Sequence, residues 1–258
     1  MPKIDVPARP GDPGRATLDT DPSGWSLEVE GRTSEDLLDR AVGEVARRGG
    51  GTFTWWVSRA TIADESLAAA RGMTPGRVLY QMRRSLPVDE EHRRGAEPLQ
   101  TRPFRPGKDE DAWLAVNNRA FSWHPEQGGW TRETIEAEEA QDWFDPEGFL
   151  IHETDGTLDG FCWTKVHPAA HPDPVLGEIY VIAADPGAAG GGFGRRLTLA
   201  GLDYLAGLGI ETGMLYVDAT NERAVKLYVD LGFVVHLLHK GFMTTVAASQ
   251  AARATGRV

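Results

Sequence analysis

Cysteine is almost missing from this 258-residue sequence, since Cys162 is the only one. A single thiol excludes an intramolecular disulfide and a metal site built from several cysteines. No apolar run approaches the ~20 residues that span a bilayer, and the opening residues, MPKIDVPARPGDPG, lack the apolar segment of a secretory signal. Basic residues are also few, 27 against 38 acidic ones, so the net charge is -11. The acidic balance argues against a nucleic-acid partner. Together, these features predict a cytoplasmic protein with no membrane partner.

Composition divides the chain into five stretches. Prolines and glycines fill residues 1–24, which predicts a flexible leader. Strand and helix periodicity over 25–87 predicts a small α/β unit, with Ser34 capping a helix. The charged, proline-bearing stretch 88–100 is interpreted as a linker. A larger α/β domain over 101–246 and a flexible tail over 247–258 follow.

The first unit repeats the layout of the end of the second, because each contains a strand, a helix and a strand in that order. The matching segments are TFTWWV, DESLAAARGM and RVLYQMRRSL in the first unit, and GMLYVDA, NERAVKLYVDLGF and VVHLLHKGF in the second. The first unit therefore resembles the back half of the second, and it has no counterpart of the front half.

The strongest signal is an apolar strand that runs into a glycine-rich loop and then a helix. The strand ends at Ala184, five glycines lie within 187–194, and the helix is expected from about Arg195. Glycine lets a ligand approach the backbone N–H groups, and a helix N-terminus favours anions, so the loop suits a phosphate or pyrophosphate. The P-loop motif fails because Phe193 stands where lysine is needed, and the dinucleotide fingerprint fails at Arg195. A merely flexible turn is the alternative.

The loop and two later segments resemble the GNAT superfamily of acyl-CoA N-acetyltransferases. Residues 189–194, AGGGFG, fit the signature Gln/Arg-x-x-Gly-x-Gly/Ala except at Ala189, while NERA (221–224) and LYVDLGF (227–233) follow in the family's order. The resemblance implies a GNAT-type α/β fold, with one complete C-terminal domain preceded by a partial GNAT-like unit. It implies acetyl-CoA as co-substrate and no metal. The implied acetyl-CoA contacts are Ile182, Ala183, Ala184, Ala189, Gly190, Gly191, Gly192, Phe193, Gly194, Arg195, Asn221, Arg223, Ala224 and Lys226.

A narrower resemblance is to the mycothiol synthase family, whose members have tandem GNAT domains. It rests on HPEQGGWT (124–131), GFCWTKVHP (160–168), GEIYVIAADP (177–186) and LTLAGLDYL (197–205). It implies acetylation of the cysteinyl amine of cysteinyl-glucosaminyl-inositol. We expect a monomer or a weak dimer. The alternatives are a GNAT enzyme for another amine, such as an antibiotic or a peptide N-terminus, and a non-catalytic CoA-binding module.

The same resemblance implies roles for individual residues. Glu178 corresponds to the family's proposed general base, and Tyr228 is placed to protonate the departing thiolate. Substrate contacts are implied for Glu126, Lys165, Glu178 and Tyr216. Each has a structural alternative: a surface carboxylate for Glu178, a core phenol for Tyr228, exposed charges for Glu126 and Lys165, and a core residue for Tyr216.

Two further residue types carry no expected chemistry. Cys162 is expected to be a small buried residue, because no histidine is placed to activate it. His167 and His171 are four residues apart, but Pro168 between them disfavours a regular helical pair, so no metal site is predicted.

Overall fold

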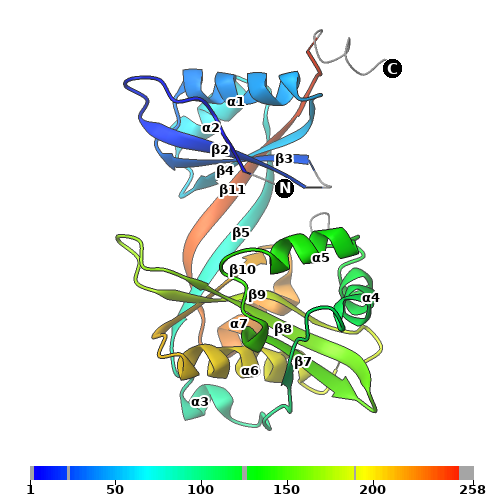
Figure 1. Ribbon diagram of the computed structural model, residues 1–258. Helices are drawn as coiled ribbons and strands as arrows, with labels where there is room; N and C mark the ends of the chain where they lie inside the picture. Colours follow the sequence, from blue (N-terminus) through cyan, green and yellow to red (C-terminus); the bar gives the residue numbers. More distant parts are fainter. Residues whose placement is uncertain (1–2, 22–23, 124–126, 189, 250–258) are drawn as a thin grey trace, which may run out of the picture. The chain divides into compact units, whose positions relative to one another are not determined.

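The computed structural model of the protein describes residues 3–21, 24–123, 127–188 and 190–249 (Figure 1). These residues form two compact units. Unit 1 takes the described parts of Met1–Tyr80, Asp218–Thr220 and Leu237–Val258, and unit 2 takes Gln81–Val217 and Asn221–His236. Three strands, β5 (Thr74–Ser85), β10 (Thr212–Asp218) and β11 (Val234–Val246), therefore have residues in both units.

Unit 1 is built on strands that run in the order β1-β2-β3-β4-β11. Its other elements are β1 (Ile4–Asp5), β2 (Gly14–Asp21), β3 (Gly24–Gly31), α1 (Glu35–Arg47), β4 (Gly51–Ser58) and α2 (Ile62–Ala69). Helix α1 begins where predicted, because the Ser34 side chain accepts a hydrogen bond from the Leu37 N–H at 3.2 Å. The apolar stripe of α1, including Leu38 and Val45, packs into a core with Phe53 and Trp55 of β4.

Unit 2 has the strand order β5-β10-β9-β8-β7-β6. Its elements are α3 (Glu90–Arg93), β6 (Arg102–Pro103), α4 (Glu110–Ala120), α5 (Arg132–Glu139), the 3₁₀ turn η1 (Pro146–Gly148), β7 (Phe149–Thr154), β8 (Thr157–His167), β9 (Leu176–Ala184), α6 (Phe193–Gly207), β10 (Thr212–Asp218) and α7 (Glu222–Asp230). Strands β7 and β8 form the predicted hairpin, turned by Asp155 and Gly156, both at positive φ.

Helices cover both faces of β8 and β9 in unit 2. Side chains alternate along a strand, so Cys162 lies on the opposite face from Phe161 and Trp163. Helix α6 packs on the Cys162 face, where Gly201 lets the helix backbone approach closely. Helix α4 packs on the other face through Trp113, whose ring lies 5.3 Å from Phe161 and 6.0 Å from Trp163, measured between centroids. The result is a helix–sheet–helix arrangement, as the α/β pattern predicts.

The structure corrects two of the expected boundaries. Residues 14–21 form β2, fully paired with β3, so the flexible-leader prediction is wrong for that stretch. Residues 88–100 lie inside unit 2 and contain α3, so they are not a linker between units. Instead, the chain first passes from unit 1 to unit 2 within β5, between Tyr80 and Gln81. The predicted tail is described only to residue 249, where the Ser249 N–H donates to Ala46 O.

Candidate active site

Strand β9 carries a bulge at the point where its pairing with β10 ends. Along β8, Trp163 pairs with Val181 and the next residue, Thr164, pairs with Ile179, so Tyr180 is the extra residue. Within the described chain, the β9–β10 ladder is parallel and covers only Gly177–Ile179 against Gly213–Leu215. Past the bulge, β9 pairs with β8 on one edge, and its other edge has no strand ladder with β10. That edge offers backbone groups to an extended ligand.

The predicted acetyl-CoA contacts at Ile182, Ala183 and Ala184 lie in this stretch of β9. Their cross-strand partners on β8 are Cys162, Phe161 and Gly160, in that order. These three residues therefore make ordinary ladder pairs with β8. This pairing leaves the opposite edge of the same residues for a pantetheine-like chain.

The glycine loop leads directly into α6. Gly190, Gly191 and Gly192 all have positive φ, at 127°, 55° and 75°, and a Cβ at any of them would meet nothing within 4 Å. Gly192 is the N-cap of α6 and supplies no side-chain cap, so the first-turn N–H groups of Gly194 and Arg195 are left outside the helical ladder. An open loop in front of unpaired donors fits a pyrophosphate. Ala189 lies outside the described residues.

The side chains around the loop have mainly structural contacts. Phe193 is buried beside the His152 ring, with 5.2 Å between centroids. The Arg195 guanidinium donates to the carbonyl oxygens of His92 and Asp230. The predicted acetyl-CoA contact at Arg195 is therefore left to its backbone N–H.

The start of α7 supplies the other predicted acetyl-CoA contacts. Asn221 is its N-cap, and the side-chain oxygen accepts from the Ala224 N–H at 3.2 Å. Arg223 is exposed, and Lys226 Nζ pairs with Asp230 Oδ2 at 3.0 Å on the helix surface. An exposed ion pair one turn apart is weak, so Lys226 is free to exchange it for a phosphate.

Glu178 is buried in β9 and has a hydrogen-bond contact that the sequence did not predict. Its Oε2 lies 2.7 Å from His167 Nε2 on β8. Lys165 is the direct cross-strand partner of Glu178, and its ammonium lies 4.0 Å from the centre of the Trp143 ring and 4.9 Å from that of Tyr180. A cation held over two aromatic rings is well positioned. The structure thus places Glu178, Lys165 and His167 side by side.

Tyr228 is buried in α7 near Phe233, with 5.9 Å between ring centroids. Burial raises the pKa of its phenol, so the hydroxyl keeps its proton at neutral pH. Cys162 is also fully buried, and burial raises its thiol pKa to about 12. The expectation of an inert cysteine agrees with this environment.

Tyr216 on β10 is the end of a polar chain that sequence reasoning missed. Its hydroxyl accepts from Gln81 Nε2 at 2.7 Å, and Gln81 Oε1 accepts from Arg83 Nε at 2.8 Å. Arg83 in turn makes a two-point ion pair with Asp173, which precedes β9. Gln81 and Arg83 are buried polar residues in β5, and such residues are nearly always there to hold a partner. Glu126 lies outside the described residues.

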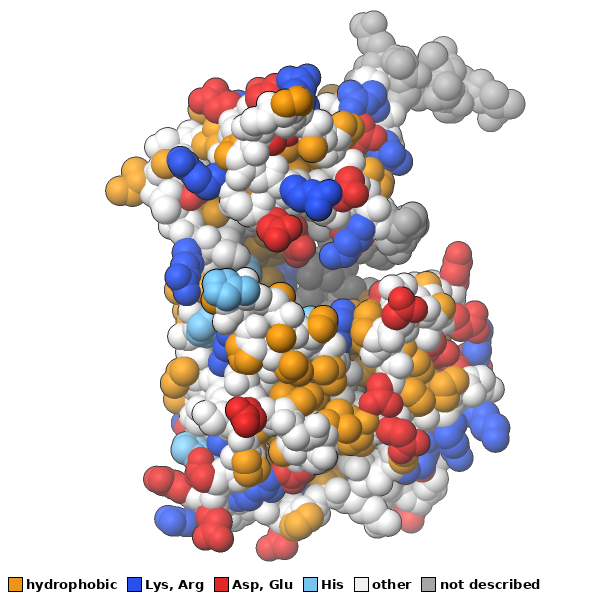
Figure 2. Space-filling model, turned by 60° about the vertical axis from the view of Figure 1, so that its left-hand side comes forward, with side chains coloured by type: hydrophobic (Ala, Val, Ile, Leu, Met, Phe, Trp, Pro, Cys, Tyr) orange, Lys and Arg blue, Asp and Glu red, His pale blue; other side chains and the backbone are white. Residues whose placement is uncertain are grey.

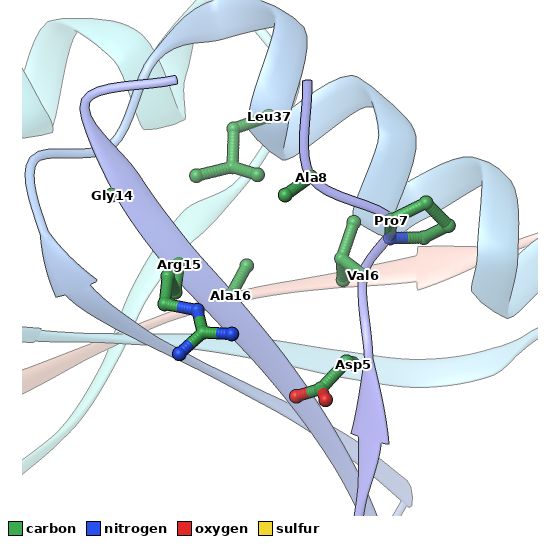
Figure 3. A pocket seen from close by; sticks show the side chains of 8 residues that line it. All are labelled: Asp5, Val6, Pro7, Ala8, Gly14, Arg15, Ala16 and Leu37. Carbon is green, nitrogen blue, oxygen red and sulfur yellow. The ribbon is translucent and has the colours of Figure 1, made fainter. Parts of the chain in front are cut away.

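A separate hollow lies in unit 1 and does not hold any of these residues. Figure 3 shows it between β1, β2 and α1. Its lining consists of Asp5, Val6, Pro7, Ala8, Gly14, Arg15, Ala16 and Leu37. At about 140 Å³ it is smaller than the ~300 Å³ at which ligand pockets begin, so the site in unit 2 remains the candidate.

The described residues contain no cluster of three or more potential metal ligands among His, Cys, Asp and Glu. Across the same residues, no helix combines the length and apolar character that a membrane span needs. On the face displayed in Figure 2, acidic and basic side chains are interspersed rather than separated into patches of one sign.

Comparison with known proteins defines the class. Residues 113–233 match the acetyltransferase (GNAT) family. The crystal structure of a GCN5-related N-acetyltransferase from Sphaerobacter thermophilus aligns with a TM-score of 0.72 at 20% identity, covering 92% of this chain and 78% of that one. The α/β fold, with its strand, glycine loop and helix, is that of the GNAT acetyltransferases, as the motifs predicted.

Two curated relatives, each called mycothiol acetyltransferase, narrow the class. The protein from Acidimicrobium ferrooxidans is 53% identical over 183 residues, which are 70% of this chain and 58% of that one. The protein from Thermobispora bispora is 45% identical over 213 residues, which are 82% of this chain and 72% of that one. The chain belongs to the mycothiol acetyltransferase family. It spans between about half and three quarters of the length of these relatives.

Proposed function

We propose that this chain transfers the acetyl group of acetyl-CoA to the cysteinyl amine of cysteinyl-glucosaminyl-inositol, the step that forms mycothiol. The observation that carries the proposal is the opening of β9 away from β10 directly before the glycine loop. Along β9, the edge at 182–184 that has no ladder with β10 lies between Glu178 and the glycine loop that opens α6. The identity to relatives called mycothiol acetyltransferase supports the acceptor. Cytoplasmic location and oligomeric state stay predictions.

In the proposed mechanism the protein binds the cofactor along its backbone. The N–H groups of the loop and the first turn of α6 hold the pyrophosphate, and the free edge of β9 at 182–184 pairs with the pantetheine chain. One N–H of this edge stabilises the oxyanion that forms when the thioester carbonyl is attacked.

Glu178 then takes a proton from the acceptor ammonium, directly or through a water. An α-amine has a pKa near 8, so a carboxylate is a sufficient base close to neutral pH. Tyr228, whose phenol stays protonated, supplies a proton to the leaving thiolate. Lys165 and Tyr216 hydrogen-bond to the hydroxyl-rich part of the acceptor, where charge-assisted hydrogen bonds are strong.

The decisive assay offers acetyl-CoA with one of three amines: cysteinyl-glucosaminyl-inositol, an aminoglycoside, or a peptide with a free N-terminus. The acetylated product is detected by mass, because the first acceptor carries its own thiol and would react with a thiol reagent. A Gly192→Asp variant is the matched negative control. Transfer to the sugar-linked cysteine supports the proposal. Transfer only to another amine redirects the acceptor, and acetyl-CoA binding without any transfer identifies a binding module.

A further inference from the structure

Amine acetylation leaves one proton over in each turnover. The acceptor ammonium loses two protons as it becomes an amide, and the departing thiolate takes one of them. The other must reach water before the next cycle. If Glu178 is the base, that proton starts on a carboxyl whose side chain is only 8% exposed, and a bound acceptor would cover it further.

His167 is the neighbour of Glu178 that reaches solvent. Its Nε2 lies 2.7 Å from Glu178 Oε2, while its own side chain is 34% exposed. The two residues come from adjacent strands: His167 is two positions from Lys165, the direct cross-strand partner of Glu178. This diagonal geometry across a strand pair is rigid, because both backbones are held in the sheet.

Two other ionisable groups that the structure describes in unit 2 are poorly suited to accept this proton. Lys165 has an ammonium over the Trp143 ring, and it accepts no proton while charged. Asp173 is engaged on both oxygens by Arg83, and its hydrogen bonds to that guanidinium lower its pKa. Imidazole, by contrast, has two ring nitrogens and can take a proton at one while it releases a proton at the other, which suits a proton carrier.

We propose that His167 is the proton exit of the site, an inference that rests on the proposed function. After Glu178 has taken the amine proton, the proton moves from Oε2 to Nε2 of the neutral imidazole tautomer that carries its hydrogen on Nδ1. The imidazolium then releases its Nδ1 proton to water, and the half-exposed ring returns to the starting tautomer by proton exchange with water. Glu178 is thereby returned to its ionised form. His167 acts through Glu178 and does not touch the acceptor, so it is a positioning and relay residue rather than a catalytic one.

Two variants separate proton transfer from simple orientation. His167→Gln keeps an N–H that can hold the Glu178 carboxylate but cannot carry a proton, and His167→Ala removes both properties. We expect both to lower kcat by roughly tenfold or more, since positioned proton transfer typically contributes about 10²–10⁴-fold to the rate. The dissociation constant of acetyl-CoA should stay within about threefold, because the loop at α6 is untouched. Added imidazole should restore at least about half of the lost kcat in His167→Ala, since the residue lies at the surface.

His92→Ala is the matched control. His92 also pairs with a carboxylate, with Nδ1 2.8 Å from Asp89 Oδ1, and its side chain is likewise 34% exposed. It should show wild-type kcat and no response to imidazole. Wild-type kcat in His167→Gln would overturn the relay and leave only an orienting contact. Absence of imidazole rescue in folded His167→Ala would overturn it as well. Wild-type enzyme that acetylates no amine would refute the proposed function, and this inference with it.

Discussion

Arg83 and Asp173 form a two-point ion pair, with Arg83 Nη1 2.7 Å from Asp173 Oδ1 and Arg83 Nη2 2.9 Å from Asp173 Oδ2. The pair joins β5 to the segment that precedes β9. Because Arg83 also holds Gln81, and Gln81 holds the Tyr216 hydroxyl, the orientation of Tyr216 depends on a carboxylate that is distant in sequence. If Tyr216 contacts the acceptor, the pair contributes to acceptor binding without touching the acceptor.

Asp173→Asn should therefore raise the KM for the acceptor by roughly five- to tenfold, with little change in the affinity for acetyl-CoA. This equals about 1–1.4 kcal/mol, within the ~0.5–1.5 kcal/mol that a hydrogen bond contributes on balance. Asp203→Asn is the control, because Asp203 on α6 is paired through both oxygens with Arg93 of α3. Steady-state kinetics with each substrate varied in turn makes the comparison. Equal KM values in both variants would show that Tyr216, and the ion pair that orients it, do not contribute to acceptor binding.

Gly192→Asp should abolish acetyl-CoA binding in a folded protein. The substitution adds a carboxylate at the N-terminus of α6, where the pyrophosphate is proposed to sit, and we expect at least about 100-fold weaker binding by calorimetry. Gly209→Asp is the control, because Gly209 follows the other end of α6, has φ of 79° against 75°, and also has open space around its Cβ position. Both variants carry the same backbone strain, so only the position of the charge differs. Equal acetyl-CoA affinity in the two variants would show that the glycine loop is only a turn and does not bind the pyrophosphate.

Glu178→Gln and Tyr228→Phe should each lower kcat/KM by roughly 100-fold or more. The two variants should respond differently to pH. Glu178→Gln should recover part of its activity well above pH ~8, where the amine is neutral without help. Tyr228→Phe should not recover, because it lacks a proton donor. Acetyl-CoA affinity, measured separately, should stay within about threefold in both. Wild-type turnover in both variants would indicate catalysis by positioning alone.

Two alanine substitutions in α6 should change stability in opposite directions. A Cβ at Gly201 would lie 2.7 Å from Ile179 Cδ1 and still closer to Cys162 Sγ, so Gly201→Ala should lower the free energy of unfolding by about 1–3 kcal/mol. A Cβ at Gly207 would meet nothing within 4 Å, so Gly207→Ala should raise it by about 0.5–1 kcal/mol. Urea unfolding followed by circular dichroism measures both. A stabilised Gly201→Ala would contradict the close packing of α6 on β8 and β9.

Glu139 predicts a pH-dependent loss of stability. Burial raises its pKa to about 7 from an ordinary value of 4.5, and the nearby carboxylates of Glu110 and Glu136 add to the effect. Because the folded state holds this proton more tightly, the free energy of unfolding falls as pH rises from 4.5 through about 7.

Glu139→Gln removes that titration. Its melting temperature should exceed that of the wild type at about pH 8, and the difference should shrink at about pH 4. Glu133→Gln, on the exposed surface of the same helix, is the control and should follow the wild type at both pH values. A pH-independent difference for Glu139→Gln would mean that the carboxyl is not protonated in the folded protein.

Sequence patterns predicted those features of the fold and the site that depend on a few neighbouring residues. The loop at Gly190–Gly192 follows from glycine backbone freedom, and the start of α1 follows from the Ser34 cap, because each depends on a few neighbouring residues. Strand β2 was missed, since its alternating residues lie among prolines and glycines. Its order comes from pairing with β3, which a propensity argument does not contain.

The supporting residues of the site could not be predicted because their partners are distant in sequence. Gln81 and Arg83 belong to a recognisable strand, but the strand pattern does not say that Tyr216 and Asp173 lie beside them. One signal was available: three polar residues, Gln81, Arg83 and Arg84, close one end of that strand and require partners if buried. His167 was considered only with His171 as a metal pair, and its contact with Glu178 needs the β8–β9 register.

The division of β11 between the units has a consequence for synthesis on the ribosome. Strand β4 pairs with β11, and Ser58 meets His239, 181 residues further along the chain. The sheet of unit 1 therefore stays incomplete while nearly all of unit 2 is translated, and the edge of β4 must wait without its neighbour. At ~5–20 residues per second, that wait lasts on the order of ten to forty seconds. Unit 1, whose first strands are synthesised earliest, can therefore be completed only after unit 2 has been translated.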